Sequence, residues 1–331
     1  MRNSTRLFAI VLVLASGFAQ AQWTWTPQTG RFVNLKRMPK ETPELQLEYA
    51  RTLMVEGDYR KAFRETEKFV EYYGSDVLAD ENQFLRGEIQ MAQGQWMNAA
   101  KSFQQLIAAY PDSDRYDEAV RKQYDIGDQY YARGEQLAGK KWRIFRNRPY
   151  KRAGEVYTMV VDNQPFAPAA AEAQYKIGLC HYARKQYIDA AFEYQRVVED
   201  YSASDWVNDA SFGLAMCYYE ASLPPEYDQT PSEMAIAAID DFEARFPEDE
   251  RGVDLQGKKT EMRETIAMQR LQTARFYERR REFPAAKLYY ELLIRDYPDT
   301  ESAATATAWL EENNTLVHVG DKYEAGVRSE L

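Results

Sequence analysis

The sequence predicts an all-α fold in which about six helical hairpins stack into a solenoid. The first observation is a series of alanines in one register: Ala62, Ala99, Ala153, Ala190, Ala235 and Ala286. An aromatic residue stands eleven positions after five of these six alanines. The second observation is a small residue on the helix before each alanine: Ala50, Gly87, Gly127, Gly178, Gly213 and Ala274. Such matches in a shared register are typical of paired helices that repeat along a chain.

Residues 274–299 show one unit in full. Ala274 lies on the expected first helix, and Pro284 suits the first position of the second, where its missing N–H is no loss. Ala286 and Tyr290 then follow at helical spacing on one apolar face. Pro298 ends the unit, because the residue before a proline is disfavoured in a helix. These spacings are those of tetratricopeptide (TPR) repeats, so we expect a TPR-type solenoid.

The chain divides into five parts on this interpretation. Residues 1–21 are a signal peptide, 22–43 an extended segment, 44–112 repeats one and two, 113–310 repeats three to six, and 311–331 a C-terminal tail. Repeats three and five carry insertions at 134–149 and 222–231, which we expect to lie between their helices.

The N-terminus has the features of a secretory signal. Arg2 and Arg6 precede an apolar run, and Ala19-Gln20-Ala21 offers a cleavage site. We expect a periplasmic mature chain that starts at Gln22, with an uncleaved anchor as the alternative. The cysteines of this sequence are Cys180 and Cys217, and we favour buried free thiols over a disulfide.

Composition and motifs argue for a binding protein. A net charge of −10 argues against a nucleic-acid partner, which usually requires a basic surface. The sequence contains no zinc-protease motif, phosphate-binding glycine loop or serine-hydrolase motif. We therefore expect no enzymatic activity, no cofactor and no metal.

First helices line the concave side of a TPR solenoid, which places a candidate partner-binding groove. Its expected residues are Met54, Met91, Tyr124, Tyr131, Tyr175, Tyr182 and Arg275. Methionine and aromatic side chains suit apolar or aromatic peptide segments. The alternative is that these side chains only pack neighbouring helices.

A basic segment at 140–152, KKWRIFRNRPYKR, is unusual in an acidic chain. We predict a loop here that contacts an anionic membrane surface or an acidic partner. The candidate contact residues are Lys140, Lys141, Trp142, Arg143, Arg146 and Arg148. The alternative is a solvated insertion.

Two stretches resemble a known family. The run from Ala210 (ASFGLAMCYYEA) to AIDDFEARFPEDE is similar to the third repeat of BamD/YfiO-type outer-membrane assembly factors. The stretch QTARFYERRREFPAAKLYYELLIRDYPDT is similar to their fourth repeat, so the resemblance covers roughly residues 124–310. It implies a scaffold at the periplasmic face of the outer membrane. Its implied partners are the barrel-inserting subunit and unfolded outer-membrane proteins.

One feature departs from this family. No cysteine follows Ala21, where the family carries its lipid-anchored residue, so we expect a mature chain without an acyl group. A second interpretation is a periplasmic TPR adaptor of envelope constriction or peptidoglycan synthesis, similar to Tol-Pal-associated coordinators. An envelope enzyme with a TPR shell is a third.

Overall fold

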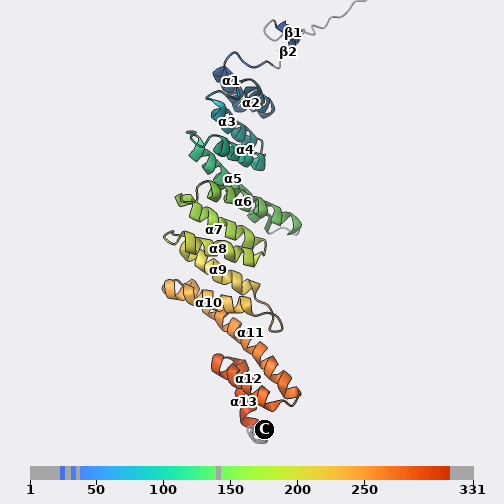
Figure 1. Ribbon diagram of the computed structural model, residues 1–331, viewed down its shortest axis with the longest axis vertical. Helices are drawn as coiled ribbons and strands as arrows, with labels where there is room; N and C mark the ends of the chain where they lie inside the picture. Colours follow the sequence, from blue (N-terminus) through green and yellow to red (C-terminus); the bar gives the residue numbers. More distant parts are fainter. Residues whose placement is uncertain (1–22, 27–30, 35–37, 139–142, 314–331) are drawn as a thin grey trace, which may run out of the picture. The chain divides into compact units, whose positions relative to one another are not determined.

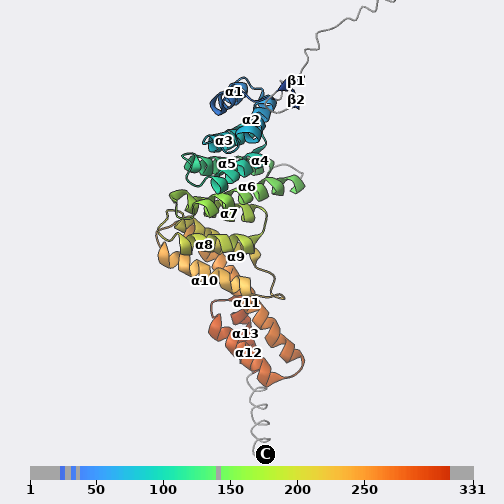
Figure 2. The ribbon, with the colours of Figure 1, turned by 45° about the horizontal axis from the view of Figure 1, so that its top comes forward.

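The computed structural model describes the backbone of residues 23–26, 31–34, 38–138 and 143–313, and the side chains of 38–137 and 147–313. Nearly all of these residues belong to helices that pair into antiparallel hairpins (Figures 1 and 2). The chain forms two compact units, which meet in sequence at Tyr116. A TPR-type all-α fold is confirmed.

The first unit contains two strands and two hairpins. The strands β1 (Trp23–Thr26) and β2 (Arg31–Asn34) pair antiparallel, with Trp25 opposite Phe32. The helices are α1 (Pro43–Val55), α2 (Tyr59–Tyr73), α3 (Ala79–Ala92) and α4 (Trp96–Ala109). The strand pair lies in the segment that we expected to be extended, but its hairpin pairing was not predicted.

The second unit contains four hairpins and one further helix. Its helices are α5 (Tyr116–Ala138), α6 (Arg143–Asn163), α7 (Pro168–Ala183), α8 (Tyr187–Asp200), α9 (Val207–Ala221), α10 (Thr230–Arg245), α11 (Arg251–Arg279), α12 (Phe283–Asp296) and α13 (Glu301–Glu312). The helix α13 packs against α11 and α12, and Trp309 stacks on Tyr290 with 4.5 Å between ring centroids. It therefore covers the apolar face of the last hairpin, as terminal repeats require.

Contacts between small and large residues explain the shared spacing of the reference alanines and the small residues of the first helices. All six reference alanines are completely buried. The aromatic residue four positions later lies over the small residue of the first helix in three of these hairpins, as Phe103 over Gly87, Tyr157 over Gly127 and Tyr194 over Gly178. A Cβ atom on any of these glycines would stand 2.5 Å from the ring. The glycines are therefore needed for close helix packing.

Four hairpin turns use one left-handed residue at a shared position. Gly57 and Gly94 have φ of 82° and 71°, which glycine adopts without steric cost. Lys185 and Arg281 stand at the same position with φ of 63° and 61°, although a Cβ atom disfavours this conformation. The turn geometry is thus set by packing of the helices on both sides.

Glutamine side chains join the two helices of three hairpins. Gln46 Nε2 donates to the carbonyl of Glu65 at 2.8 Å, and Gln83 Nε2 donates to that of Ser102 at 2.9 Å. Gln174 repeats the contact with the Glu193 carbonyl at 3.5 Å and also donates to the Glu193 carboxylate. Each partner lies nineteen residues later. Sequence reasoning missed this repeated polar link, although the glutamines share one register.

The prediction of a loop at 134–149 in repeat three was wrong for much of that range. The helix α5 continues to Ala138, and α6 begins at Arg143, so the insertion lengthens both helices. Tyr150 is 1% exposed and lies over Gly134, where a Cβ atom would be 2.6 Å from its ring. This contact repeats the Tyr157–Gly127 contact seven residues later on α5 and seven residues earlier on the antiparallel α6, which explains why the two helices extend together.

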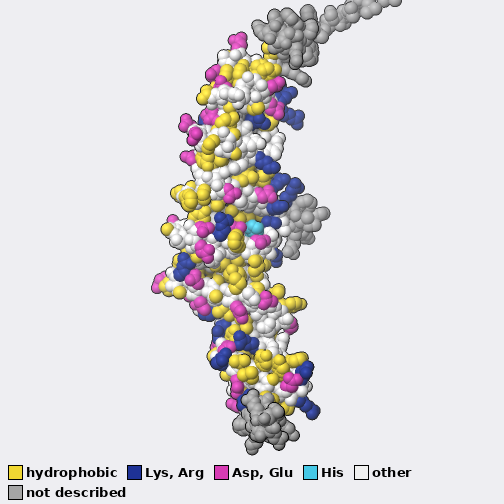
Figure 3. Space-filling model, viewed as in Figure 1, with side chains coloured by type: hydrophobic (Ala, Val, Ile, Leu, Met, Phe, Trp, Pro, Cys, Tyr) yellow, Lys and Arg dark blue, Asp and Glu magenta, His cyan; other side chains and the backbone are white. Residues whose placement is uncertain are grey.

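On the face seen in Figure 3, acidic and basic side chains are interspersed among exposed hydrophobic ones. Within the described part of the chain, no helix is long and apolar enough to cross a membrane.

Candidate functional site

Four of the predicted groove residues lie on two neighbouring first helices. Tyr124 and Tyr131 belong to α5, and Tyr175 and Tyr182 belong to α7. All four side chains are partly exposed. We call these four residues the tyrosine row.

Each ring of the tyrosine row packs edge-on or tilted against a ring of the second helix. The centroid distances are 5.7 Å for Tyr124–Tyr157, 5.4 Å for Tyr131–Tyr150, 5.4 Å for Tyr175–Tyr194 and 5.3 Å for Tyr182–Tyr187. Such aromatic pairs stabilise a fold by about 0.5–1.5 kcal/mol beyond the area they bury. The tyrosines therefore pack their own hairpins and still present part of each ring to solvent.

Lys176 of α7 fixes α5 and α7 against each other. Its Nζ lies 2.7 Å from Asp128 Oδ1 and donates to the Tyr124 hydroxyl at 2.8 Å. It also lies 4.6 Å from the centroid of the Tyr124 ring. These contacts bring the two halves of the tyrosine row together.

The electrostatics of this region favour neutral tyrosines and a charged lysine. Burial raises the pKa of Tyr131, Tyr175 and Tyr182 to about 12 in each case. Burial alone would lower the pKa of Lys176, but its hydrogen bonds to Asp128, Tyr124 and Glu172 outweigh that effect and raise it. The row thus presents neutral hydroxyl groups beside one fixed positive charge.

The other predicted groove residues do not join the tyrosine row. Met54 and Met91 are partly exposed on α1 and α3 and belong to the first unit. Arg275 is exposed on α11, which packs against α9, α10, α12 and α13. Their place in a shared binding groove remains a prediction.

The candidate contact residues of the basic segment are only partly described. Lys140, Lys141 and Trp142 lie outside the described residues, as do the side chains of Arg143 and Arg146. Arg148 is exposed on α6, whereas Tyr150 is buried and cannot contact a surface. Membrane contact by this segment stays a prediction.

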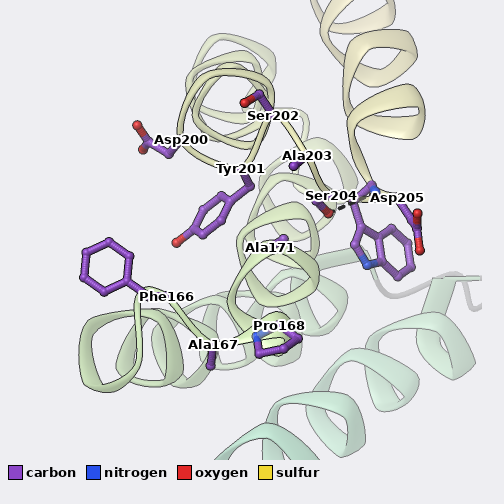
Figure 4. A pocket seen from close by; sticks show the side chains of 11 residues that line it. Phe166, Ala167, Pro168, Ala171, Asp200, Tyr201, Ser202, Ala203, Ser204 and Asp205 are labelled. Atoms are coloured by element: carbon purple, nitrogen blue, oxygen red, sulfur yellow. Dashed lines mark hydrogen bonds between the residues drawn. The ribbon is translucent and has the colours of Figure 1, made fainter.

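A pocket of about 450 Å³ lies at the end of the hairpin formed by α7 and α8, and sequence reasoning missed it (Figure 4). The loop after α6 contributes Phe166, which is 97% exposed, and the end of α8 with the loop after it contributes residues 200–206. Figure 4 shows the rings of Phe166 and Tyr201 at one end of this pocket, with Ala171 of α7 beyond them. We call it the junction pocket.

The two thiols are buried, and the described residues offer no cluster of metal ligands. Cys180 and Cys217 are free and buried, as predicted, and burial raises the pKa of each thiol to about 12. Among the described residues, no group of three or more His, Cys, Asp or Glu side chains is placed to hold a metal ion.

Comparison with known proteins identifies the family. The model of the YfiO family, described as outer membrane lipoprotein, matches residues 140–326, more than half of the chain. The chain belongs to this family. A tetratricopeptide-repeat model also matches residues 81–113. The family match includes α7, Tyr175, Tyr182 and the junction pocket, and it begins after Tyr131.

A curated relative agrees with this assignment. The outer membrane protein assembly factor BamD of Caulobacter vibrioides is 23% identical over 157 residues. The match covers 47% of this chain and 52% of the relative, so it spans about half the length of that protein.

Two solved TPR structures are similar to this chain at low TM-scores. A thermophilic TPR protein of Thermus thermophilus has 16% identity and a TM-score of 0.31, covering 67% of this chain and 98% of that one. A tetratricopeptide repeat protein of Parabacteroides merdae has 16% identity and a TM-score of 0.32, covering 76% and 91%.

Proposed function

We propose that this chain is a periplasmic TPR scaffold that binds extended segments of partner proteins during the assembly of outer-membrane β-barrel proteins. Membership of the YfiO family supports this role, as does the similarity to a protein named as an assembly factor. The observation that carries it is the tyrosine row, four partly exposed rings held in place on α5 and α7.

The tyrosine row has the properties of a protein-binding surface. Tyrosine offers a large apolar face and a polar tip, and it is enriched among residues that dominate binding energy at interfaces. Here the rings are already packed against second-helix aromatics, and Lys176 ties α5 to α7. Binding of a partner would therefore cost little ordering entropy on this side of the interface.

The proposed partners are the barrel-inserting outer-membrane subunit and unfolded outer-membrane proteins. A chain in this role would lie at the periplasmic face of the outer membrane. We propose that partners and the basic segment hold it there.

Affinity purification from detergent-solubilised envelopes tests the role. The full chain and a Tyr131→Ala/Tyr182→Ala variant would be compared, with Tyr72→Ala on α2 as the control, since Tyr72 is 46% exposed outside the row. We expect the barrel-inserting subunit to co-purify with the unaltered chain and the control, and to be depleted with the double variant. Recovery of cell-wall synthases instead would support the envelope-constriction alternative and contradict the assembly role.

A further inference from the structure

Four junctions between hairpins share one turn. In the first of them Asp76 accepts from the backbone N–H of Leu78 at 2.9 Å, so the residue that donates there is neither an arginine nor aromatic. Ser113, Ser204 and Asp249 each accept a hydrogen bond from the backbone N–H two residues later, at 3.1, 3.1 and 2.9 Å. The residues that donate are Arg115, Trp206 and Arg251. These three side chains therefore start from equivalent backbone positions.

At two of these junctions the chain places an arginine between a carboxylate and an aromatic ring. Arg115 Nε lies 2.6 Å from Glu81 Oε1, and its guanidinium is 5.1 Å from the Phe84 ring centroid. Arg251 Nη1 lies 2.8 Å from Asp209 Oδ1, and its guanidinium is 4.8 Å from the Phe212 centroid. Guanidinium groups suit such sites because they stack on rings and pair with carboxylates.

At the third junction the chain supplies rings and carboxylates without that arginine. Trp206 stacks on Tyr175, with 5.1 Å between centroids, and lines the junction pocket with Tyr201. Asp205 also lines this pocket, is exposed, and has no ion-pair or hydrogen-bond partner among the described residues. Asp200 pairs with Arg196 Nε at 3.6 Å, an exposed pair that contributes little.

In the last hairpin, the tyrosine at the position that corresponds to Tyr201 contacts an arginine side chain. Tyr297 corresponds to Tyr201, and the preceding Asp296 corresponds to Asp200. The guanidinium of Arg270 lies 4.9 Å from the Tyr297 ring centroid and pairs with Asp296. The same tyrosine–aspartate combination therefore binds a guanidinium group within this molecule.

We propose that the junction pocket binds the side chain of an arginine in an extended segment of a partner protein. The carboxylate of Asp200 would pair with the guanidinium group and the Tyr201 ring would contact its plane, as Asp296 and Tyr297 do for Arg270. Asp205 and Trp206, at the other end of the pocket, would contact the neighbouring residues of the segment (Figure 4). The acidic rim and the net charge of −10 complement a basic segment. The inference rests on the proposed peptide-binding role but uses a surface separate from Tyr131 and Tyr182.

Calorimetric titration of the full chain with two seven-residue peptides tests this proposal. One peptide has a central arginine between two leucines, and the other has citrulline, its neutral isostere, at that position. We expect the arginine peptide to bind at least tenfold more tightly. We also expect Asp200→Asn/Asp205→Asn to weaken it at least fivefold without affecting the citrulline peptide.

Two further variants sharpen the test. Trp206→Arg places at this junction the residue that Arg115 and Arg251 supply at two others, so it should fold. Its positive charge in the pocket should weaken arginine-peptide binding. Asp114→Asn is the matched control, because Asp114 is exposed at the position that corresponds to Asp205. It should leave binding unchanged.

These titrations decide whether the junction pocket binds an arginine side chain. Equal affinity for both peptides, no binding of either, or full binding by Trp206→Arg would overturn the proposal. The Tyr131→Ala/Tyr182→Ala variant should still bind the arginine peptide. Failure of the assembly role in envelopes is therefore distinguishable from failure of this pocket.

Discussion

The ring of Tyr194 lies so close to Gly178 that a Cβ atom there would stand 2.5 Å from its Cε1 atom. Gly213 of the next hairpin approaches the other edge of the same ring, at 2.8 Å for an added Cβ. One tyrosine thus packs two consecutive first helices, and it does so only because both present a glycine.

Gly178→Ala should therefore destabilise the protein. The added methyl group must displace a fully buried ring, and overpacking of this kind costs about 1–3 kcal/mol. Gly257→Ala in α11 is the control, because nothing lies within 4 Å of its added Cβ and alanine favours a helix. Urea unfolding should show a lower midpoint for the first variant and an unchanged or higher midpoint for the second.

Lys185→Gly should stabilise the protein. Lys185 occupies the left-handed turn position that Gly57 and Gly94 fill elsewhere, and a non-glycine residue there costs about 1 kcal/mol. The gain is reduced because glycine is also more flexible when unfolded, so we expect an increase of about 0.5 kcal/mol. Lys287→Gly, within α12, should instead lower stability, and a loss for Lys185→Gly would contradict the steric argument.

Tyr131→Ala with Tyr182→Ala should weaken the binding of aromatic-ended peptides at least tenfold, since interface tyrosines typically contribute about 1–3 kcal/mol each. Both rings also pack against Tyr150 and Tyr187, so some thermal stability will be lost. The matched control is Tyr131→Phe/Tyr182→Phe, which keeps the ring contacts. Unchanged peptide affinity in the alanine variant, beside a large drop in melting temperature, would assign these rings to packing alone.

The thiols of Cys180 and Cys217 should be unreactive in the folded protein. Burial raises the pKa of each from 9.0 to about 12, which leaves about a thousandfold less thiolate near neutral pH. A thiol reagent such as dithionitrobenzoate should react slowly with native protein and at once after unfolding in urea. Rapid reaction under native conditions would show that α7 and α9 open readily.

Stability should fall at alkaline pH. Unfolded thiols and phenols ionise near their ordinary pKa values of 9.0 and 10.0, whereas the folded ones remain protonated until about pH 12. Between these limits the folded state binds more protons, so stability is complete below pH 9 and decreases as the pH rises toward 12. Urea unfolding at pH 8, 9, 10 and 11 measures this decrease. A constant midpoint would contradict the assigned burial.

The basic segment should bind anionic vesicles at low salt, because each basic residue near such a surface gains up to about 1 kcal/mol and salt screens the attraction. Changing Lys140, Lys141, Arg143 and Arg146 to Gln should abolish flotation with the vesicles. The control changes four exposed cations elsewhere, namely Arg60, Arg64, Lys101 and Arg121. Equal flotation of both variants, or none of the unaltered chain, would leave the segment as a solvated insertion or a protein contact.

The hairpin fold could be predicted from sequence because each repeat depends on short-range packing. Ala286 and Ala274 already indicate which faces of two helices meet, and helices of adjacent sequence bury those faces against each other. The same short-range spacing predicted buried free thiols at Cys180 and Cys217, and it picked out the first-helix tyrosine of each aromatic pair in the tyrosine row.

Only the tertiary structure decided the features that join separate turns or helices. Tyr150 looked like an exposed interface residue in a basic loop, yet its contact with Gly134 buries it and extends both α5 and α6. The link from Lys176 to Asp128 joins residues 48 positions apart, and the junction pocket is lined from two different loops, by Phe166 and by residues 201–206. The periodicity of a sequence indicates which face of a helix is buried. Which residues meet between neighbouring hairpins depends instead on how the repeats stack, and the shapes of all the side chains on both contacting faces decide that stacking.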